Sequence, residues 1–93
     1  MNEKDIERKL KMAVKNKGGL APKFVSPGLD GMPDRLILLP KGKIAFVELK
    51  APGKEMRELQ KHRKRQLEKL GFLVFCIDSP EQIEVILNEL QTT

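Results

Sequence analysis

Two acidic residues and one lysine stand at the ends of two neighbouring apolar segments. Asp34 opens the first segment, and Glu48 and Lys50 close the second, residues 43–50. Residues two apart in a strand share a face, so the side chains of Glu48 and Lys50 point the same way. A tight turn at Pro40-Lys41-Gly42 would fold the second strand back on the first and bring Asp34 opposite Glu48. The sequence therefore predicts two carboxylates and one ammonium group at one edge of a sheet.

Two carboxylates held at close range repel each other unless a proton or a cation lies between them. Carboxylate oxygens select Mg²⁺ or Mn²⁺, and Mg²⁺ keeps coordination positions for water and a substrate phosphate. The backbone carbonyl of Leu49 is a further expected ligand, because this residue lies between Glu48 and Lys50. Lys50 would bring a positive charge to the attacking water or to the charge that develops at phosphorus. The residue types thus indicate metal-assisted hydrolysis of a phosphate ester.

A purely structural role for these three residues is the alternative. Asp34, which follows a proline, would cap a turn, and Glu48 and Lys50 would form a surface ion pair worth about 0–1 kcal/mol. Glu-x-Lys alone is a short pattern that arises often by chance. Its position at a strand end, after Pro-Asp and a hairpin, favours the metal site.

Hydrophobic periodicity predicts the elements that position this edge. The expected helices are 3–17, 55–70 and the segment after Ser79, and the expected strands are 21–25, 35–39, 43–50 and 72–77. Asn2 and Ser79 are expected to cap the first and last helices. The inner side of the second helix is expected to consist of Met56, Leu59, Leu67 and Leu70.

The connection from the third expected strand to the fourth passes through a helix, which is the usual parallel crossover. The order αβββαβα therefore predicts an α/β fold in which helices flank a mixed central sheet. A length of 93 residues favours one domain, residues 1–93.

Basic residues outnumber acidic ones, with 18 Lys and Arg against 13 Asp and Glu and a net charge of +5. This balance favours a polyanionic partner, and the positive charge gathers between Lys50 and Lys69. A solvated helix face laced with glutamates is the alternative for this run.

Cys76 is the only cysteine, which excludes an internal disulfide and fits a reducing interior. No apolar run is long enough to cross a bilayer, and the charged first ten residues lack a signal-peptide segment. We therefore expect no membrane partner and a location in the cytoplasm.

The motifs resemble those of the VRR-NUC (virus-type replication-repair nuclease) family, a member of the PD-(D/E)xK nuclease superfamily. The resemblance covers nearly the whole chain and is carried by Gly31-Met32-Pro33-Asp34, Phe46-Val47-Glu48-Leu49-Lys50, Gln60 and Gly71. It implies a restriction-endonuclease-like core and an endonuclease that uses Mg²⁺ or Mn²⁺ to hydrolyse DNA. It also implies that Asp34 and Glu48 bind the metal and that Lys50 is the catalytic lysine. Gln60 matches the family's glutamine, which could orient a water, a metal-bound group or Lys50.

The family also has an acidic residue on the first helix, and two residues compete for this place. Glu7 has a Glu-x-x-Leu relation to Leu10 that resembles the superfamily's first-helix acid, so we expect it to assist at the metal. Glu3 lies nearer the centre of the apolar stripe but close to the chain terminus, and it stays open as the alternative.

Stand-alone members of the family, of phage or bacterial type, resemble this chain. They imply a location in a bacterial or phage-infected cell and a homodimer that acts on branched DNA such as four-way (Holliday) junctions. The residues expected to contact DNA are Lys23, Arg35, Lys54, Arg57, Lys61 and Lys64. For Arg35, balancing a nearby charge is the alternative. A flap or single-strand nicking nuclease, an inactive DNA-binding or adaptor module on the same fold, and a purely structural assembly protein are the competing functions.

Overall fold

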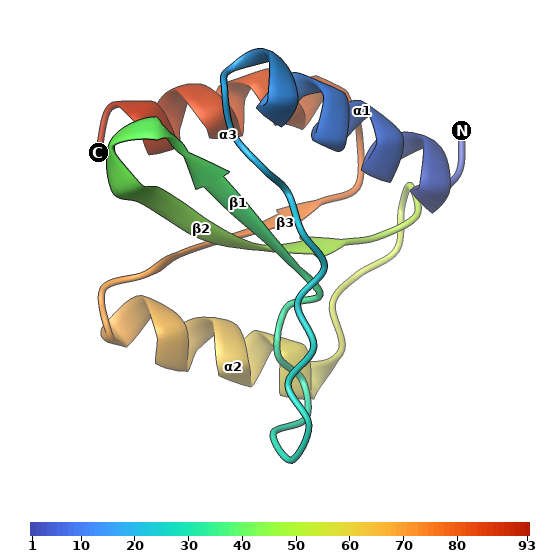
Figure 1. The fold of residues 1–93 in the computed structure, drawn as a ribbon. Helices are drawn as coiled ribbons and strands as arrows, with labels where there is room; N and C mark the ends of the chain where they lie inside the picture. Colours follow the sequence, from blue (N-terminus) through green and yellow to red (C-terminus); the bar gives the residue numbers. More distant parts are fainter.

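Three helices and a three-stranded sheet alternate along the chain in the computed structural model, which describes residues 1–93 (Figure 1). The elements, in chain order, are α1 (Glu3–Asn16), β1 (Arg35–Leu39), a 3-10 turn (Pro40–Gly42), β2 (Lys43–Leu49), α2 (Glu58–Lys69), β3 (Leu73–Ile77) and α3 (Glu81–Gln91). None of the helices is long and apolar enough to cross a membrane.

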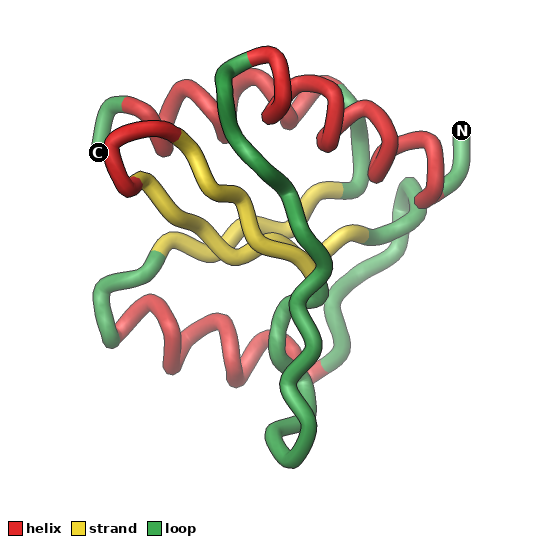
Figure 2. Tube along the Cα trace, in the orientation of Figure 1, coloured by secondary structure: helices red, strands yellow, loops and turns green.

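The sheet has the strand order β1-β2-β3 and is mixed, as the sequence predicts. β1 pairs with β2 in antiparallel register across the short turn, and β2 pairs with β3 in parallel through the α2 crossover. α1 and α3 cover one face of the sheet, and α2 covers the other (Figures 1 and 2). The fold is therefore the expected α/β arrangement with helices on both sides of a mixed sheet.

The strand expected at residues 21–25 is not formed, so the order is αββαβα. This segment runs beside β1 but pairs with it only through isolated bridges, Leu20 with Leu38 and Lys23 with Arg35. Pro22 lies between the two bridges and accepts a hydrogen bond from Leu36 N, but it has no N–H to donate. The missing donor interrupts the ladder.

The main core lies between the sheet and the α1/α3 layer, where α1 contributes Ile6, Leu10 and Val14. The α2 layer is thinner, because Leu67 is the only apolar residue of α2 that is buried. Leu59 and Leu70, expected on the inner side, are 44% and 73% exposed. Leu70 follows the last turn of the helix. α2 also begins three residues later than expected.

The helix starts are fixed by side chains. Asn2 caps α1 as expected: its Oδ1 accepts from Asp5 N at 3.0 Å, and Asp5 Oδ2 accepts from Asn2 N at 3.1 Å. Ser79 does not cap α3. Instead, Gln82 Oε1 accepts from the backbone N–H groups of Asp78 and Ser79 at 2.8 and 3.2 Å.

The loop between α1 and β1 forms an arm that projects past α2 (Figure 1). Its returning limb is fixed to α2, because Arg63 Nε donates to Asp30 O at 2.7 Å. Gly31 has a φ of +83°, and a Cβ there would lie 2.6 Å from Leu59 Cγ. This contact explains why Leu59 covers the arm and not the sheet. It also fixes the chain three residues before Asp34.

Candidate active site

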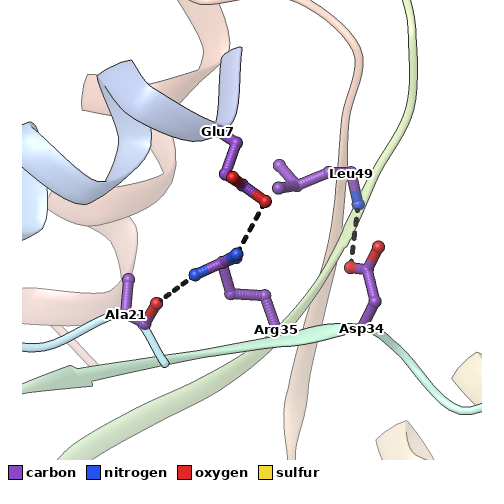
Figure 3. A network of polar contacts seen from close by, with 5 residues as sticks. All are labelled: Glu7, Ala21, Asp34, Arg35 and Leu49. Atoms are coloured by element: carbon purple, nitrogen blue, oxygen red, sulfur yellow. Dashed lines mark hydrogen bonds and ion pairs between the residues drawn. The ribbon is translucent and has the colours of Figure 1, made fainter. Parts of the chain in front are cut away.

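Asp34 and Glu48 meet at the edge of the sheet where β2 ends. The register of β1 and β2 pairs Arg35 with Val47, and one further step places Asp34 opposite Glu48. Asp34 Oδ1 accepts a hydrogen bond from Leu49 N at 3.3 Å (Figure 3). The two carboxylates are close enough for Asp34 to raise the pKa of Glu48. The sequence-based pairing of these two residues agrees with this arrangement.

Glu48 is buried, and its two carboxylate oxygens have different surroundings. Oε2 accepts from Gln60 Nε2 at 3.0 Å and lies 3.7 Å from the ammonium nitrogen of Lys50. Oε1 is buried and has no hydrogen-bond partner. Burial, then the charge of Asp34, raises the pKa of Glu48 to about 7, although Lys50 opposes the shift.

Asp34 is also shifted toward the neutral form. Burial raises its pKa, and the hydrogen bond from Leu49 N together with the charges of Arg35 and Lys50 only partly offsets this effect. The buried carboxyl group of Glu48 and the half-buried one of Asp34 thus lie near each other in surroundings that disfavour their ionisation. This is the electrostatic situation that a divalent cation relieves.

The residues present fit such a cation. Glu48 Oε1 is an unpartnered oxygen beside a second carboxylate, and both groups are hard donors of the kind that Mg²⁺ and Mn²⁺ prefer. No group of three or more His, Cys, Asp or Glu side chains lies close enough together to hold a metal ion. The protein side chains thus offer two carboxylates at this point, which suits a metal that keeps several waters.

Gln60 links α2 to this pair. Its side chain is buried, with Nε2 donating to Glu48 and Oε1 accepting from the backbone N–H of Arg57 at 2.8 Å. Both ends of the amide are therefore used within the protein. Gln60 orients Glu48 and closes the first turn of α2, whereas a water, a metal-bound group or Lys50 was its expected partner.

The side chain of Arg35 reaches toward α1 and lines the same hollow as Asp34 (Figure 3). Its side chain is buried, Nη2 donates to Glu7 Oε2 at 2.7 Å, and Nη1 donates to the carbonyl of Ala21 (Figure 3). The expected phosphate contact of Arg35 does not fit this arrangement, because its guanidinium is already used inside the protein. The alternative, charge balance, describes it: Arg35 neutralises Glu7 and joins α1, β1 and the segment before the arm.

The two first-helix acids lie at the same hollow as Asp34. This hollow of about 300 Å³ is lined by Glu3, Glu7, Lys23, Phe24, Val25, Asp34 and Arg35. Glu7 is held in place by Arg35. Glu3 is exposed, and its charge makes a smaller contribution, after burial and Asp34, to the raised pKa of Glu48.

The cations expected to contact DNA differ in whether they form ion pairs within the protein. Lys61 and Lys64 pair with acidic residues one turn away, at 3.5 Å from Glu58 and 2.8 Å from Glu68. Among the cations expected to contact DNA, the exposed ones that make no ion pair are Lys23, Lys54 and Arg57. Of these, Lys23 lies at the hollow that contains Asp34.

A mixed sheet between helices that carries Pro-Asp and Glu-x-Lys at one edge defines a nuclease fold of the PD-(D/E)xK type. No family model matches the chain. A solved structure described as a VRR_NUC domain superposes with a TM-score of 0.85 at 30% identity, covering 92% of this chain and 94% of that one. The chain is also 44% identical over 86 residues to a phage protein, with 92% of each chain covered. That protein is named "Putative nuclease p44" and comes from Acyrthosiphon pisum secondary endosymbiont phage 1. The chain belongs to the VRR-NUC nuclease family.

Proposed function

We propose that the protein is a Mg²⁺- or Mn²⁺-dependent endonuclease that hydrolyses DNA as a single domain spanning residues 1–93. The observation that carries this proposal is the pair of carboxylates at the sheet edge, with one buried oxygen of Glu48 left unpartnered and Lys50 beside the other. Membership of a nuclease family supports hydrolysis over a purely structural role.

In this proposal, Asp34, Glu48 and the backbone carbonyl of Leu49 hold the metal, and Glu7 assists from α1. Such a metal, when bound, supplies Lewis acidity and a lower pKa for water. Lys50 keeps its ammonium group beside Glu48, where it orients the attacking water or stabilises the charge that develops at phosphorus. Gln60 holds Glu48 in the ligating orientation.

We propose branched DNA, such as four-way junctions, as the substrate and a homodimer as the acting form. A two-fold dimer would present two such sites to the symmetric strands of a junction. Lys23, Lys54 and Arg57 are free to contact phosphates, and Lys61 and Lys64 would exchange their glutamate partners for them.

The test is a cleavage assay on four-way junction, flap, duplex and single-stranded DNA with Mg²⁺, Mn²⁺ or chelator. Junction cleavage is expected with either metal and is expected to disappear in chelator. An Asp34→Asn preparation, purified identically, reveals contaminating nuclease. Salt-sensitive DNA binding without cleavage in any metal would identify an inactive DNA-binding module, and preferred cleavage of flaps or single strands would replace the junction proposal.

A matched pair of substitutions decides the first-helix acid. Glu7→Gln is expected to lower the rate of cleavage at saturating DNA by about a hundredfold if Glu7 assists at the metal. It should also lower the free energy of unfolding by about 1–3 kcal/mol, because Arg35 would keep a buried charge with only a neutral partner.

Glu3→Gln is the control, since this exposed carboxylate makes no hydrogen bond and its loss should change stability by less than about 0.5 kcal/mol. Rates are compared at a temperature where denaturation curves show both variants folded. A large loss of rate in Glu3→Gln with near-normal cleavage in Glu7→Gln would transfer the role to Glu3.

A further inference from the structure

A groove runs along the outer side of α1, on the far side of Glu7 from the carboxylate pair. We call it the α1 groove. It has a volume of about 600 Å³ and lies between the helix and the segment Gly19–Ala21. Its basic side chains are Arg8, Lys11 and Lys15, and its apolar ones include the exposed Met12 and Leu20.

The charge of the α1 groove is concentrated and largely unopposed. Arg8, Lys11 and Lys15 follow each other at spacings of three and four, so they share one side of the helix. α1 has no acidic residue after Glu7. Lys11 and Lys15 make no ion pair, and Arg8 has only an exposed contact at 3.8 Å to Asp5. The lysines of α2 expected to contact DNA, Lys61 and Lys64, are paired instead.

The α1 groove and the hollow of the candidate active site meet at Glu7. Glu7 lines both the groove and the hollow that contains Lys23 and Asp34. The ion pair with Arg35 largely offsets the negative charge of Glu7. Glu7 is therefore a weak electrostatic barrier to a DNA strand that passes from the groove to the hollow. From Arg8 to Lys15 the helix rises about 10 Å, which is the axial length of about three base pairs.

We propose that the α1 groove binds the sugar–phosphate backbone of the DNA arm that leads away from the cleaved bond. The inference rests on the proposed function and extends the DNA path onto α1. Three unopposed cations in a row suit successive phosphates, and the apolar side chains of Met12 and Leu20 suit the faces of the sugars. The meeting of the groove with the Asp34 hollow at Glu7 favours DNA over an acidic protein partner.

The test compares two triple variants with the same change of charge. One variant combines Arg8→Gln, Lys11→Gln and Lys15→Gln and removes the three positive charges of the groove. The control variant combines Lys9→Gln, Lys41→Gln and Lys69→Gln and removes three exposed cations that do not line the groove. Dissociation constants for a long-armed junction are measured against salt concentration in chelator, which prevents cleavage. A junction whose arms are too short to reach α1 is measured in parallel.

The groove variant is expected to bind the long-armed junction about tenfold more weakly at about 0.1 M salt, with a salt slope reduced by about 2–3. It should bind the short-armed junction like the control variant, and its single-turnover rate at saturating enzyme should stay within about twofold of wild type. Equal slopes for the two triple variants would overturn the inference.

The failures of the two proposals are distinguishable. If the groove variant shows the reduced salt slope but wild type cleaves nothing in any metal, the α1 groove stands and the nuclease proposal falls. If wild type cleaves and the groove variant keeps its DNA affinity but changes its sedimentation, the groove is a contact between copies of the chain, and the inference is wrong.

Discussion

Replacement of Lys50 by methionine is expected to lower the rate of cleavage at saturating DNA by about 10²- to 10⁴-fold. The side chain of Lys50 is mostly buried, and its ammonium nitrogen lies 3.7 Å from Glu48 Oε2. Its charge acts where water is largely excluded, so it is worth more there than at the surface. Methionine keeps most of the apolar stem and removes the charge. DNA affinity, which depends on phosphate contacts elsewhere, should change by less than about threefold.

The same substitution has a second consequence, which separates catalysis from packing. Lys50 lowers the pKa of Glu48, so its loss should push this pKa higher and raise the metal concentration needed for half-maximal rate at neutral pH. Lys69→Met is the control, because this exposed lysine makes no ion pair and is not among the proposed DNA contacts. A rate within tenfold of wild type at saturating metal would remove Lys50 from the chemistry.

The candidate site could be predicted because short-range rules determine it. The length of the turn at Pro40–Gly42 sets the register of β1 and β2, and the register sets the Asp34–Glu48 pairing. The period of two along a strand places Lys50 beside Glu48. Neither step needs knowledge of how distant elements pack, so the sequence alone was sufficient to place Asp34, Glu48 and Lys50 together.

The role of Arg35 could not be predicted in this way, because its partners come from elsewhere in the fold. Glu7 is 28 residues away, and Ala21 lies in a segment without regular structure. One signal was present in the sequence: Arg35 alternates with the neighbouring residues of β1, so it shares the buried face of Ile37 and Leu39. That side of the sheet is the α1 core, where a guanidinium needs a carboxylate partner.

The roles of Gln60 and of the α1 groove depend on packing as well. The sequence indicated a polar residue on a basic helix, but not that α2 would bury the amide between Glu48 and the start of the helix. The spacing of Arg8, Lys11 and Lys15 is visible in the sequence. The groove beside them is not, because Gly19–Ala21 forms its other wall by running beside β1.

Substitution of Glu48 by glutamine is expected to stabilise the metal-free protein above pH 7 while abolishing cleavage. The folded-state pKa of Glu48 is raised from 4.5 to about 7, so between these values the folded state holds a proton that the unfolded state has released. The free energy of unfolding of wild type therefore falls as pH rises through this window and levels off above about pH 7. At about 1.4 kcal/mol per unit, the loss reaches up to about 3 kcal/mol. The Glu48→Gln side chain has no carboxyl proton to release, and its amide oxygen can still accept from Gln60.

Urea denaturation in chelator at pH 5 and pH 8 measures this difference. At pH 5, wild type and Glu48→Gln should have similar stabilities, and at pH 8 the variant should be the more stable by about 1–3 kcal/mol. Mg²⁺ at pH 8 should restore stability to wild type and have little effect on the variant, since only the ionised pair gains from the cation. The exposed Glu55→Gln controls for loss of a negative charge alone. A wild type as stable as Glu48→Gln at pH 8 in chelator would show that burial and the charge of Asp34 do not penalise the ionised form of Glu48, and the electrostatic argument for the metal would fail.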